Sequence, residues 1–207
     1  MHPRSRHFAA AALLATTVSL AACYADHPKF KSTDVTGASW GNSLSLTGHD
    51  GKSRTLEDFR GKIVVLTFGF THCPDVCPTT LSEMAQVRKG LKPAEAQRVQ
   101  VLFMTLDPER DTRAVLAQYV PAFDPSFLGL HGDPEATRRT AKEFKIFFEK
   151  RASDAKGAYA VDHSTQSYVL DAAGRLRLMV KHDSIAADLP HDLKELLQEE
   201  GRGGAKS

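Results

Sequence analysis

Two cysteines four positions apart, each followed by a proline, are the residues of this chain best suited to chemistry. They are Cys73 and Cys77 in the stretch FTHCPDVCPTTL. Two thiols at this spacing can form a disulfide, exchange electrons with a partner, or bind a soft metal ion as thiolates. A disulfide closing so short a loop stabilises little, because the loop-closure entropy it removes grows with loop length. Redox or metal chemistry is therefore favoured over a purely structural role.

The cysteine pair is expected between a buried strand and a helix. The run KIVVLTFGF (62–70) is rich in β-branched and aromatic residues, which is typical of a buried strand. Pro78 suits the first turn of a helix that we expect to reach about Gly90. A helix N-terminus lowers the pKa of a nearby thiol. The Cys-x-x-x-Cys spacing lets both sulfurs point at one atom, and two thiolates favour Cu(I) or zinc.

The other elements are expected to alternate in type along the chain. Hairpins are predicted in LSLTGHDGKSRTL and in STQSYVLD with RLRLMV, and a second buried strand in VQVLFMTL. Helices are predicted after Asp111 or Thr112, after Asp133, and over 185–199. This order predicts an α/β fold with a central mixed β-sheet flanked by helices and an N-terminal β-hairpin. A thioredoxin-like fold is the first choice.

A soft metal needs at least a third ligand, and histidine supplies the candidates. His163, in VDHSTQSYVL, precedes a predicted strand, in a loop that faces the cysteine loop of a thioredoxin-like fold. Redox enzymes of that fold carry a cis-proline there, so a histidine favours metal binding over dithiol exchange. The other candidates are assigned to the surface or the core; they are His49, His72, His131, His182 and His191.

Four motifs together resemble one protein family. They are GFTHCPDVCPTTL, LDPERDT (106–112), YVPAFDPSFLGLHG (119–132) and VDHSTQSYVLD (161–171). On these residues the chain resembles the Sco/SenC family of copper chaperones, over roughly 40–199 and in family order. The resemblance is specific because four separate motifs occur together, whereas a cysteine pair alone would not identify a family.

The resemblance implies a thioredoxin-like fold that binds one copper ion, as Cu(I) or Cu(II), and assists assembly of the copper centre of cytochrome c oxidase. It implies Cys73, Cys77 and His163 as metal ligands, with the cysteines able to form a redox-active disulfide. Asp107 of LDPERDT lies near the site in the family and is implied to support redox exchange or partner contact; a turn residue preceding Pro108 is the alternative. The implied partners are the copper-binding subunit of the oxidase and another periplasmic copper chaperone or thiol reductant.

Two other functional classes stay open. The same cysteines would serve a thiol–disulfide oxidoreductase that reduces the copper-ligand cysteines of the oxidase subunit, so enzymatic activity is an alternative to metal delivery. A zinc-stabilised binding module normally has four protein ligands, and the fourth is missing here. The segment KRASDAKGAYA (150–160) is interpreted as a loop that could carry His163 towards or away from the sulfurs.

The N-terminal region has the pattern of an export signal. Two arginines precede an apolar run, Phe8 to Leu20, which is shorter than the ~20 residues that span a bilayer. The junction LAAC resembles the bacterial lipobox, so residues 1–22 are predicted to be a signal peptide and Cys23 a lipidation site. An ordinary cleaved signal or an uncleaved anchor is the alternative. We therefore expect a membrane-anchored lipoprotein that faces the periplasm or the cell exterior.

The remaining chain is divided by composition. Residues 23–39 are polar and aperiodic and are expected to form a flexible membrane tether, residues 40–199 one domain, and residues 200–207 a disordered tail. The net charge of the whole chain is +2, and the signal peptide carries two of its arginines. A neutral domain gives no basic face for nucleic acid.

Overall fold

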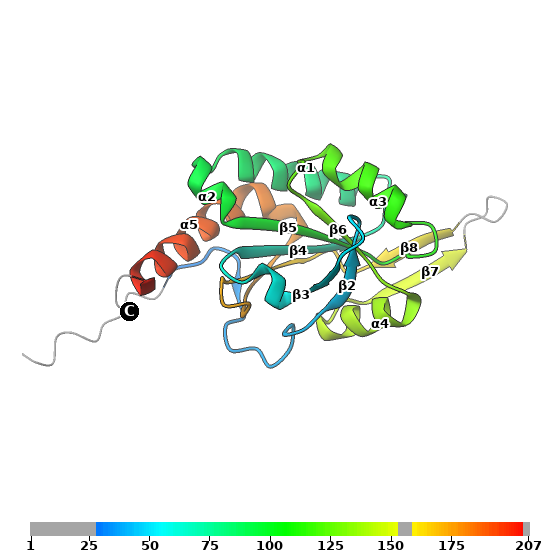
Figure 1. Ribbon diagram of the computed structural model, residues 1–207, viewed down its shortest axis with the longest axis horizontal. Coiled ribbons are helices and arrows are strands. Elements are labelled where there is room, and N and C mark those ends of the chain that lie inside the picture. Colours follow the sequence, from blue (N-terminus) through cyan, green and yellow to red (C-terminus); the bar gives the residue numbers. More distant parts are fainter. Residues whose placement is uncertain (1–27, 153–158, 205–207) are drawn as a thin grey trace, which may run out of the picture.

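The computed structural model describes residues 28–152 and 159–204, so the predicted signal peptide and Cys23 lie outside the described residues. Within these ranges, helices cover both sides of a central sheet, with α1 and α5 on one side and α4 on the other (Figure 1). The helices are α1 (Val76–Lys89), α2 (Pro93–Gln97), α3 (Arg113–Tyr119), α4 (Pro134–Glu143) and α5 (Ile185–Gly204). No helix of the described chain is long and apolar enough to cross a membrane.

The described strands form two separate sheets. An eight-stranded sheet has the order β1-β10-β9-β4-β5-β6-β2-β3, and β7 pairs only with β8. In the large sheet β4–β5 and β5–β6 are parallel and the other pairs are antiparallel. The strands are β1 (Thr33–Asp34), β2 (Ser45–Gly48), β3 (Ser53–Thr55), β4 (Ile63–Gly69), β5 (Val99–Thr105), β6 (Leu128–His131), β7 (Phe148–Ala152), β8 (Tyr159–His163), β9 (Ser167–Leu170) and β10 (Leu176–Val180). The predicted mixed sheet with flanking helices and an N-terminal hairpin, β2–β3, is confirmed.

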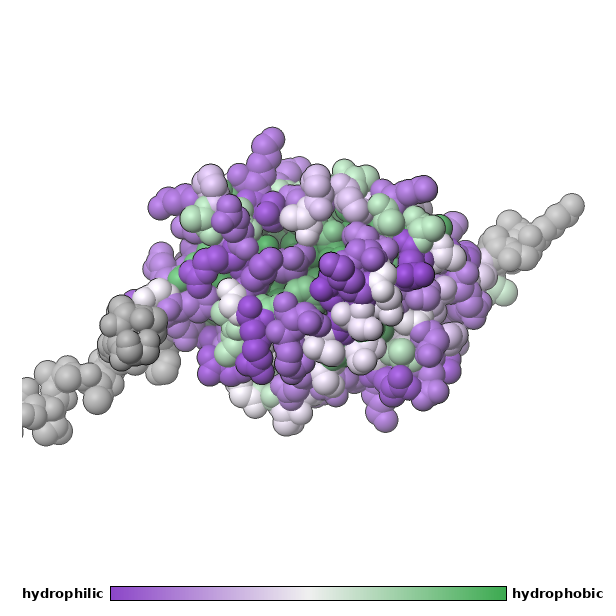
Figure 2. Space-filling model, viewed as in Figure 1, coloured by the Kyte–Doolittle hydropathy of each residue, from purple (hydrophilic) through white to green (hydrophobic). Residues whose placement is uncertain are grey.

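The central strand β4 is buried along its whole length, because helices cover both faces of the sheet. On one face Phe68 contacts an aromatic cluster with Phe144 and Tyr168, at ring-centroid distances of 5.7 and 6.3 Å. The next residue, Gly69, faces α1 instead. The face viewed in Figure 2 is covered mostly by hydrophilic side chains, with apolar ones visible between them near its centre.

Two predicted helix starts are confirmed at atomic detail. The Thr112 hydroxyl accepts a hydrogen bond from Val115 N at 3.3 Å at the start of α3, and Asp133 caps α4 by accepting from Ala136 N at 2.7 Å. Such caps satisfy amide groups that the first helical turn leaves unpaired. Asp111, the alternative cap for α3, has a different role, which is described below.

Three expectations about irregular segments are wrong in part. Both ends of the predicted loop 150–160 belong to strands, because they are part of the β7–β8 hairpin. In this hairpin Phe148 lies opposite His163. Part of the predicted tether is attached to the domain: β1 pairs with β10, and the Asp192 carboxylate accepts hydrogen bonds from the amides of Lys31 and Ser32. The final helix continues to Gly204, into the predicted tail.

Candidate metal centre

The two cysteines lie at the junction of β4 and α1. The helix begins at Val76, two residues before Pro78, so Cys77 is in its first turn and Cys73 lies in the preceding loop. Cys77 N is 3.5 Å from Cys73 Sγ and donates to it. Cys77 is 4% exposed, whereas Cys73 is half-buried. A partner molecule can therefore reach Cys73 more readily than Cys77.

The end of β4 leaves room for the buried sulfur because it carries no side chain. A Cβ atom at Gly69 would lie 2.6 Å from Cys77 Sγ and 3.0 Å from the Phe103 ring. Carbon and sulfur do not approach so closely without a shift of one of them. Gly69 thus allows Cys77 to pack directly against the strand.

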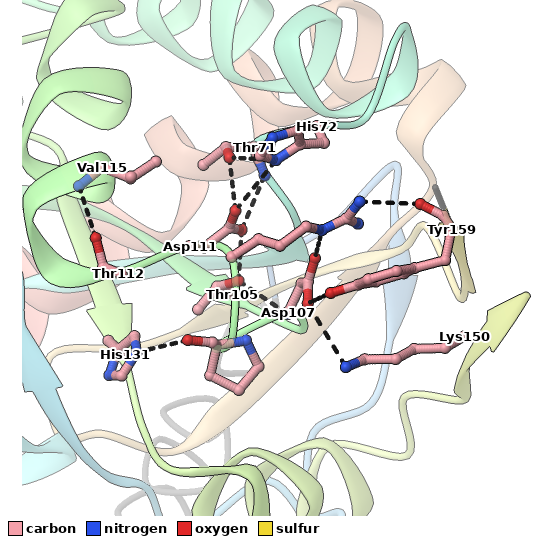
Figure 3. Close-up of polar contacts among 12 residues, drawn as sticks. Thr71, His72, Thr105, Asp107, Asp111, Thr112, Val115, His131, Lys150 and Tyr159 are labelled. Carbon is pink, nitrogen blue, oxygen red and sulfur yellow. Dashed lines mark hydrogen bonds and ion pairs between the residues drawn. The ribbon is translucent and has the colours of Figure 1, made fainter. Parts of the chain in front are cut away.

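Asp111 holds the loop that carries Cys73. Its buried carboxylate accepts hydrogen bonds from the Thr71 amide at 2.9 Å, the Thr71 hydroxyl at 2.6 Å and the Thr105 hydroxyl at 2.6 Å (Figure 3). These contacts join the β4–α1 loop to the end of β5. A buried carboxylate with several donors is costly to remove, since each donor would lose its partner. Sequence reasoning identified Asp111 only as an alternative helix cap.

His163, at the end of β8, faces the buried sulfur. Its Nε2 is 3.8 Å from Cys77 Sγ, and its Nδ1 is 2.8 Å from the Ser164 carbonyl oxygen. A carbonyl oxygen only accepts, so Nδ1 carries a proton, and the other ring nitrogen, Nε2, faces the sulfur. The edge of the Phe70 ring packs against the imidazole, with centroids 5.9 Å apart. Histidine metal ligands are commonly oriented by such a bond from the other ring nitrogen.

The three predicted ligands lie near one another but not yet at the distances of a metal site. Cys73, Cys77 and His163 come together from one loop, one helix and one strand. In the part of the chain that the structure describes, no three His, Cys, Asp or Glu side chains are grouped as a metal site requires. Ligation by all three residues therefore needs a movement of at least one of these side chains.

The two thiols differ in protonation. A hydrogen bond between the two cysteine side chains is the main cause that lowers the pKa of Cys73 to about 5. The backbone amides of Asp75 and Cys77 lower this pKa further, and burial opposes the shift. The same hydrogen bond, together with burial, raises the pKa of Cys77. The lowered pKa of Cys73 favours its thiolate, and the raised pKa of Cys77 favours retention of its proton. A metal ion that binds both sulfurs must displace that proton.

Three of the other candidate histidines have ordinary structural partners. His49 Nδ1 accepts a hydrogen bond from Gly129 N at 3.0 Å, and His131 Nε2 lies 3.1 Å from the Pro108 carbonyl oxygen. His72 is exposed beside the cysteine loop, with Nδ1 3.7 Å from Asp111 (Figure 3). None of these contacts orients a ring nitrogen towards the cysteines.

Asp107 is fully buried and does not contact the cysteines or His163. Its carboxylate accepts a hydrogen bond from the Tyr159 hydroxyl at 2.6 Å and pairs with Arg110 (Figure 3). It is thus more than a turn residue, because it connects the end of β5 to β8. Sequence reasoning missed Arg110 and Tyr159; the only signal for Arg110 was its position within LDPERDT.

Fold and site together define the class: a thioredoxin-like protein in which a cysteine pair at the start of a helix faces a histidine. The family model described as SCO1/SenC matches residues 33–198. The chain therefore belongs to the SCO1/SenC family, which confirms the resemblance found in its motifs.

Individual relatives agree with this assignment. The chain is 43% identical over 132 residues to the mitochondrial SCO2 homolog of Bos taurus, a match that covers 63% of the chain and 50% of the relative. The solution structure of apo Sco1 from Thermus thermophilus is 38% identical with a TM-score of 0.71, covering 84% of this chain and 98% of that one. ScoI from Bradyrhizobium japonicum, solved with copper bound, is 34% identical with a TM-score of 0.66, covering 76% and 99%. The chain spans about half the length of the curated relatives it matches.

Proposed function

We propose that this protein binds one copper ion with Cys73, Cys77 and His163 and delivers it during assembly of the copper centre of cytochrome c oxidase. The observation that carries the proposal is the approach of His163 Nε2 to 3.8 Å from Cys77 Sγ. Two sulfur ligands and one imidazole form a donor set that suits Cu(I). The copper-bound ScoI of Bradyrhizobium japonicum supports copper as the metal.

The mechanism follows from the protonation of the thiols. Cys73, whose lowered pKa favours the thiolate, is the more accessible residue, on which Cu(I) can first bind. Binding of Cys77 then releases its proton to solvent, and His163 completes a three-coordinate site. Affinity for Cu(I) should fall as the pH falls, because protons compete for the sulfurs. Oxidation to a Cys73–Cys77 disulfide, with a partner disulfide as the oxidant, removes two electrons and the proton of Cys77. It leaves no thiolate for the metal, so it abolishes tight binding.

The difference between the two thiols also supports a second function, thiol–disulfide exchange. The exposed Cys73 thiolate can attack a disulfide of the oxidase subunit and displace one thiolate. Cys77 then attacks the mixed disulfide, loses its proton, and releases the second thiolate of the partner. The protein ends as a disulfide and the partner as a dithiol. Such a reaction would prepare the copper-ligand cysteines of the acceptor.

The proposed cellular setting is an exported, membrane-anchored lipoprotein with lipid on Cys23. The LAAC junction supports it, because a cysteine at that place is otherwise hard to explain. Part of the segment expected to be a tether, residues 29–36, is attached to the domain. The proposed partners are the oxidase copper-binding subunit and a periplasmic copper chaperone or thiol reductant.

A transfer assay tests the function. Copper-loaded protein, carrying Cys23→Ser so that only the site thiols remain, is mixed anaerobically with the reduced, copper-free soluble domain of the oxidase copper-binding subunit. We expect copper to appear in the acceptor, and its metal absorption to develop. The control is the same protein with Cys77→Ser, which should arrive without tightly bound copper. Retention of copper by the donor, combined with rapid reduction of an oxidised acceptor, would replace delivery by reduction as the main role.

A further inference from the structure

A polar cluster outside the proposed ligands joins the β5–α3 loop to the β7–β8 hairpin. Its centre is one buried carboxylate, that of Asp107, which Figure 3 shows between Tyr159 and Lys150. The members of the cluster are Asp107, Glu109 and Arg110 of the loop and Lys150 and Tyr159 of the hairpin. The proposed function does not use these residues.

Asp107 is the centre of the cluster, with 0% of the residue exposed. It accepts a hydrogen bond from the Tyr159 hydroxyl at 2.6 Å and pairs with Arg110 Nε, while Lys150 Nζ stands 3.9 Å away. A buried carboxylate is tolerated when it is paired and hydrogen-bonded in this way. Its partners on the hairpin are therefore held strongly to the loop.

Arg110 contacts Tyr159 in three ways. Its Nη1 donates to the Tyr159 carbonyl oxygen at 3.0 Å, and its guanidinium lies 3.6 Å from the centroid of the Tyr159 ring. Through Asp107 it also connects to the Tyr159 hydroxyl. One arginine thus fixes both the backbone and the side chain at the first residue of β8.

The contact matters because β8 ends at His163. The β7–β8 hairpin forms its own sheet and shares no ladder with the large sheet. Two strands alone are marginally stable, so side-chain contacts must set the position of the hairpin. Arg110 also lies 5.9 Å from the Phe70 ring, whose edge packs on the His163 imidazole. The cluster therefore acts on the histidine from both ends of the strand.

We propose that Arg110 and Tyr159, linked through Asp107, are positioning residues that keep His163 Nε2 directed at Cys77. The inference rests on the proposed function, in which His163 is a copper ligand. Two thiolates satisfy Cu(I), whereas Cu(II) depends more on the imidazole. Loss of the positioning contacts should therefore weaken Cu(II) binding much more than Cu(I) binding.

The test measures both oxidation states in chains that carry Cys23→Ser. The variants are Arg110→Ala, which removes the two direct contacts of this arginine with Tyr159, and Tyr159→Phe, which removes only the bond to Asp107. Arg151→Ala is the matched control, because it removes a surface ion pair of the same hairpin, with Asp162. Cu(II) and Cu(I) affinities are measured by competition, and the Cu(II)–thiolate absorption and electron paramagnetic resonance spectra are recorded.

We expect Arg110→Ala to lose about 10-fold or more in Cu(II) affinity, as is typical when groups that orient a metal ligand are removed. Its spectrum should move towards that of His163→Ala, Tyr159→Phe should show a smaller effect, and Arg151→Ala none. Should Arg110→Ala fail to fold, Tyr159→Phe decides. Unchanged Cu(II) spectra and affinity in a folded variant, or equal losses for both oxidation states, would overturn the inference. If His163→Ala itself bound Cu(II) like the parent chain, the ligand assignment would fail instead.

Discussion

Cys73 and Cys77 have the same chemical group but different tasks, which their surroundings impose. Cys73 is half-buried and receives hydrogen bonds, so its thiolate is stable; Cys77 is buried and donates, so its thiol is stable. An accessible nucleophile with a buried second thiol serves both metal capture and disulfide exchange. The geometry at the residue scale thus accounts for why the two proposed functions share one site.

A prediction at this scale concerns the pKa of Cys73. Replacement Cys77→Ala removes the largest contribution that lowers this pKa, so the pKa should rise from about 5 towards the usual value for a thiol. In the chain with Cys23→Ser, the rate of alkylation by iodoacetamide is measured against pH. In the parent chain the alkylation rate should reach its maximum above about pH 6. In Cys77→Ala the rate should reach its maximum only at a higher pH. The Cys73→Ala control should react slowly throughout. Coincident profiles for the parent and Cys77→Ala would refute the proposed hydrogen bond between the thiols.

The proposed ligands could be identified from the sequence, but the residues proposed to orient them could not. The two cysteines lie in one motif and His163 lies in a second. Once the fold is recognised, the position of the second motif opposite the first follows from it. Arg110 and Tyr159 are 49 positions apart, and nothing in either local sequence indicates their contact. Asp111 was recognised as polar and close to a helix start, yet its carboxylate points back to the cysteine loop.

At the scale of elements, the parallel pair β4–β5 brings the site together. Both strands end at the same edge of the sheet, so the cysteine loop after β4 and the Asp107–Asp111 turn after β5 become neighbours. Buried strands of this kind were predictable from their unbroken apolar runs. The hairpin β7–β8 was not, because four of the five residues of β7 are exposed and show no alternation. For the same reason β1, with two exposed residues, was predicted as tether.

The attachment of the N-terminal segment gives a prediction at this scale. Asp192 is buried and accepts from Lys31 N at 2.8 Å and Ser32 N at 2.9 Å. Asp192→Ala should lower the free energy of unfolding by roughly 2–3 kcal/mol, since each hydrogen bond to a charged group contributes ~1.5–3 kcal/mol and the segment is partly exposed. Urea unfolding measures the loss, and trypsin should cut at Lys29 and Lys31 faster.

A milder variant provides the control for this prediction. His191→Ala removes one exposed contact, from the imidazole to the Lys29 carbonyl oxygen, and should change stability by less than ~1 kcal/mol. Equal stability and equal trypsin cleavage of Asp192→Ala and the parent chain would show that residues 29–36 are not held by Asp192. Copper binding should be the same in both variants, because neither residue contacts the site.

At the scale of the whole molecule, attachment and chemistry are separated. The β7–β8 hairpin, with His163, lies at one end, and the C-terminal end of α5 lies at the other (Figure 1). The N-terminal segment binds to α5 and β10, away from the cysteines. A protein tethered through this segment would present its metal centre at the end far from the anchor. Such an arrangement suits exchange of a metal ion with a partner.

The most direct test of the account is an anaerobic Cu(I) titration of the reduced chain carrying Cys23→Ser. We expect one tightly bound copper ion per chain in the parent protein. Cys73→Ser and Cys77→Ser should lose tight binding, and His163→Ala should bind Cu(I) more weakly and Cu(II) much more weakly, since a ligand is removed in each case. Parent-like Cu(I) binding in either cysteine variant would contradict the account. No copper binding by the parent protein, with a rapidly exchanging Cys73–Cys77 disulfide, would make it a thiol reductase.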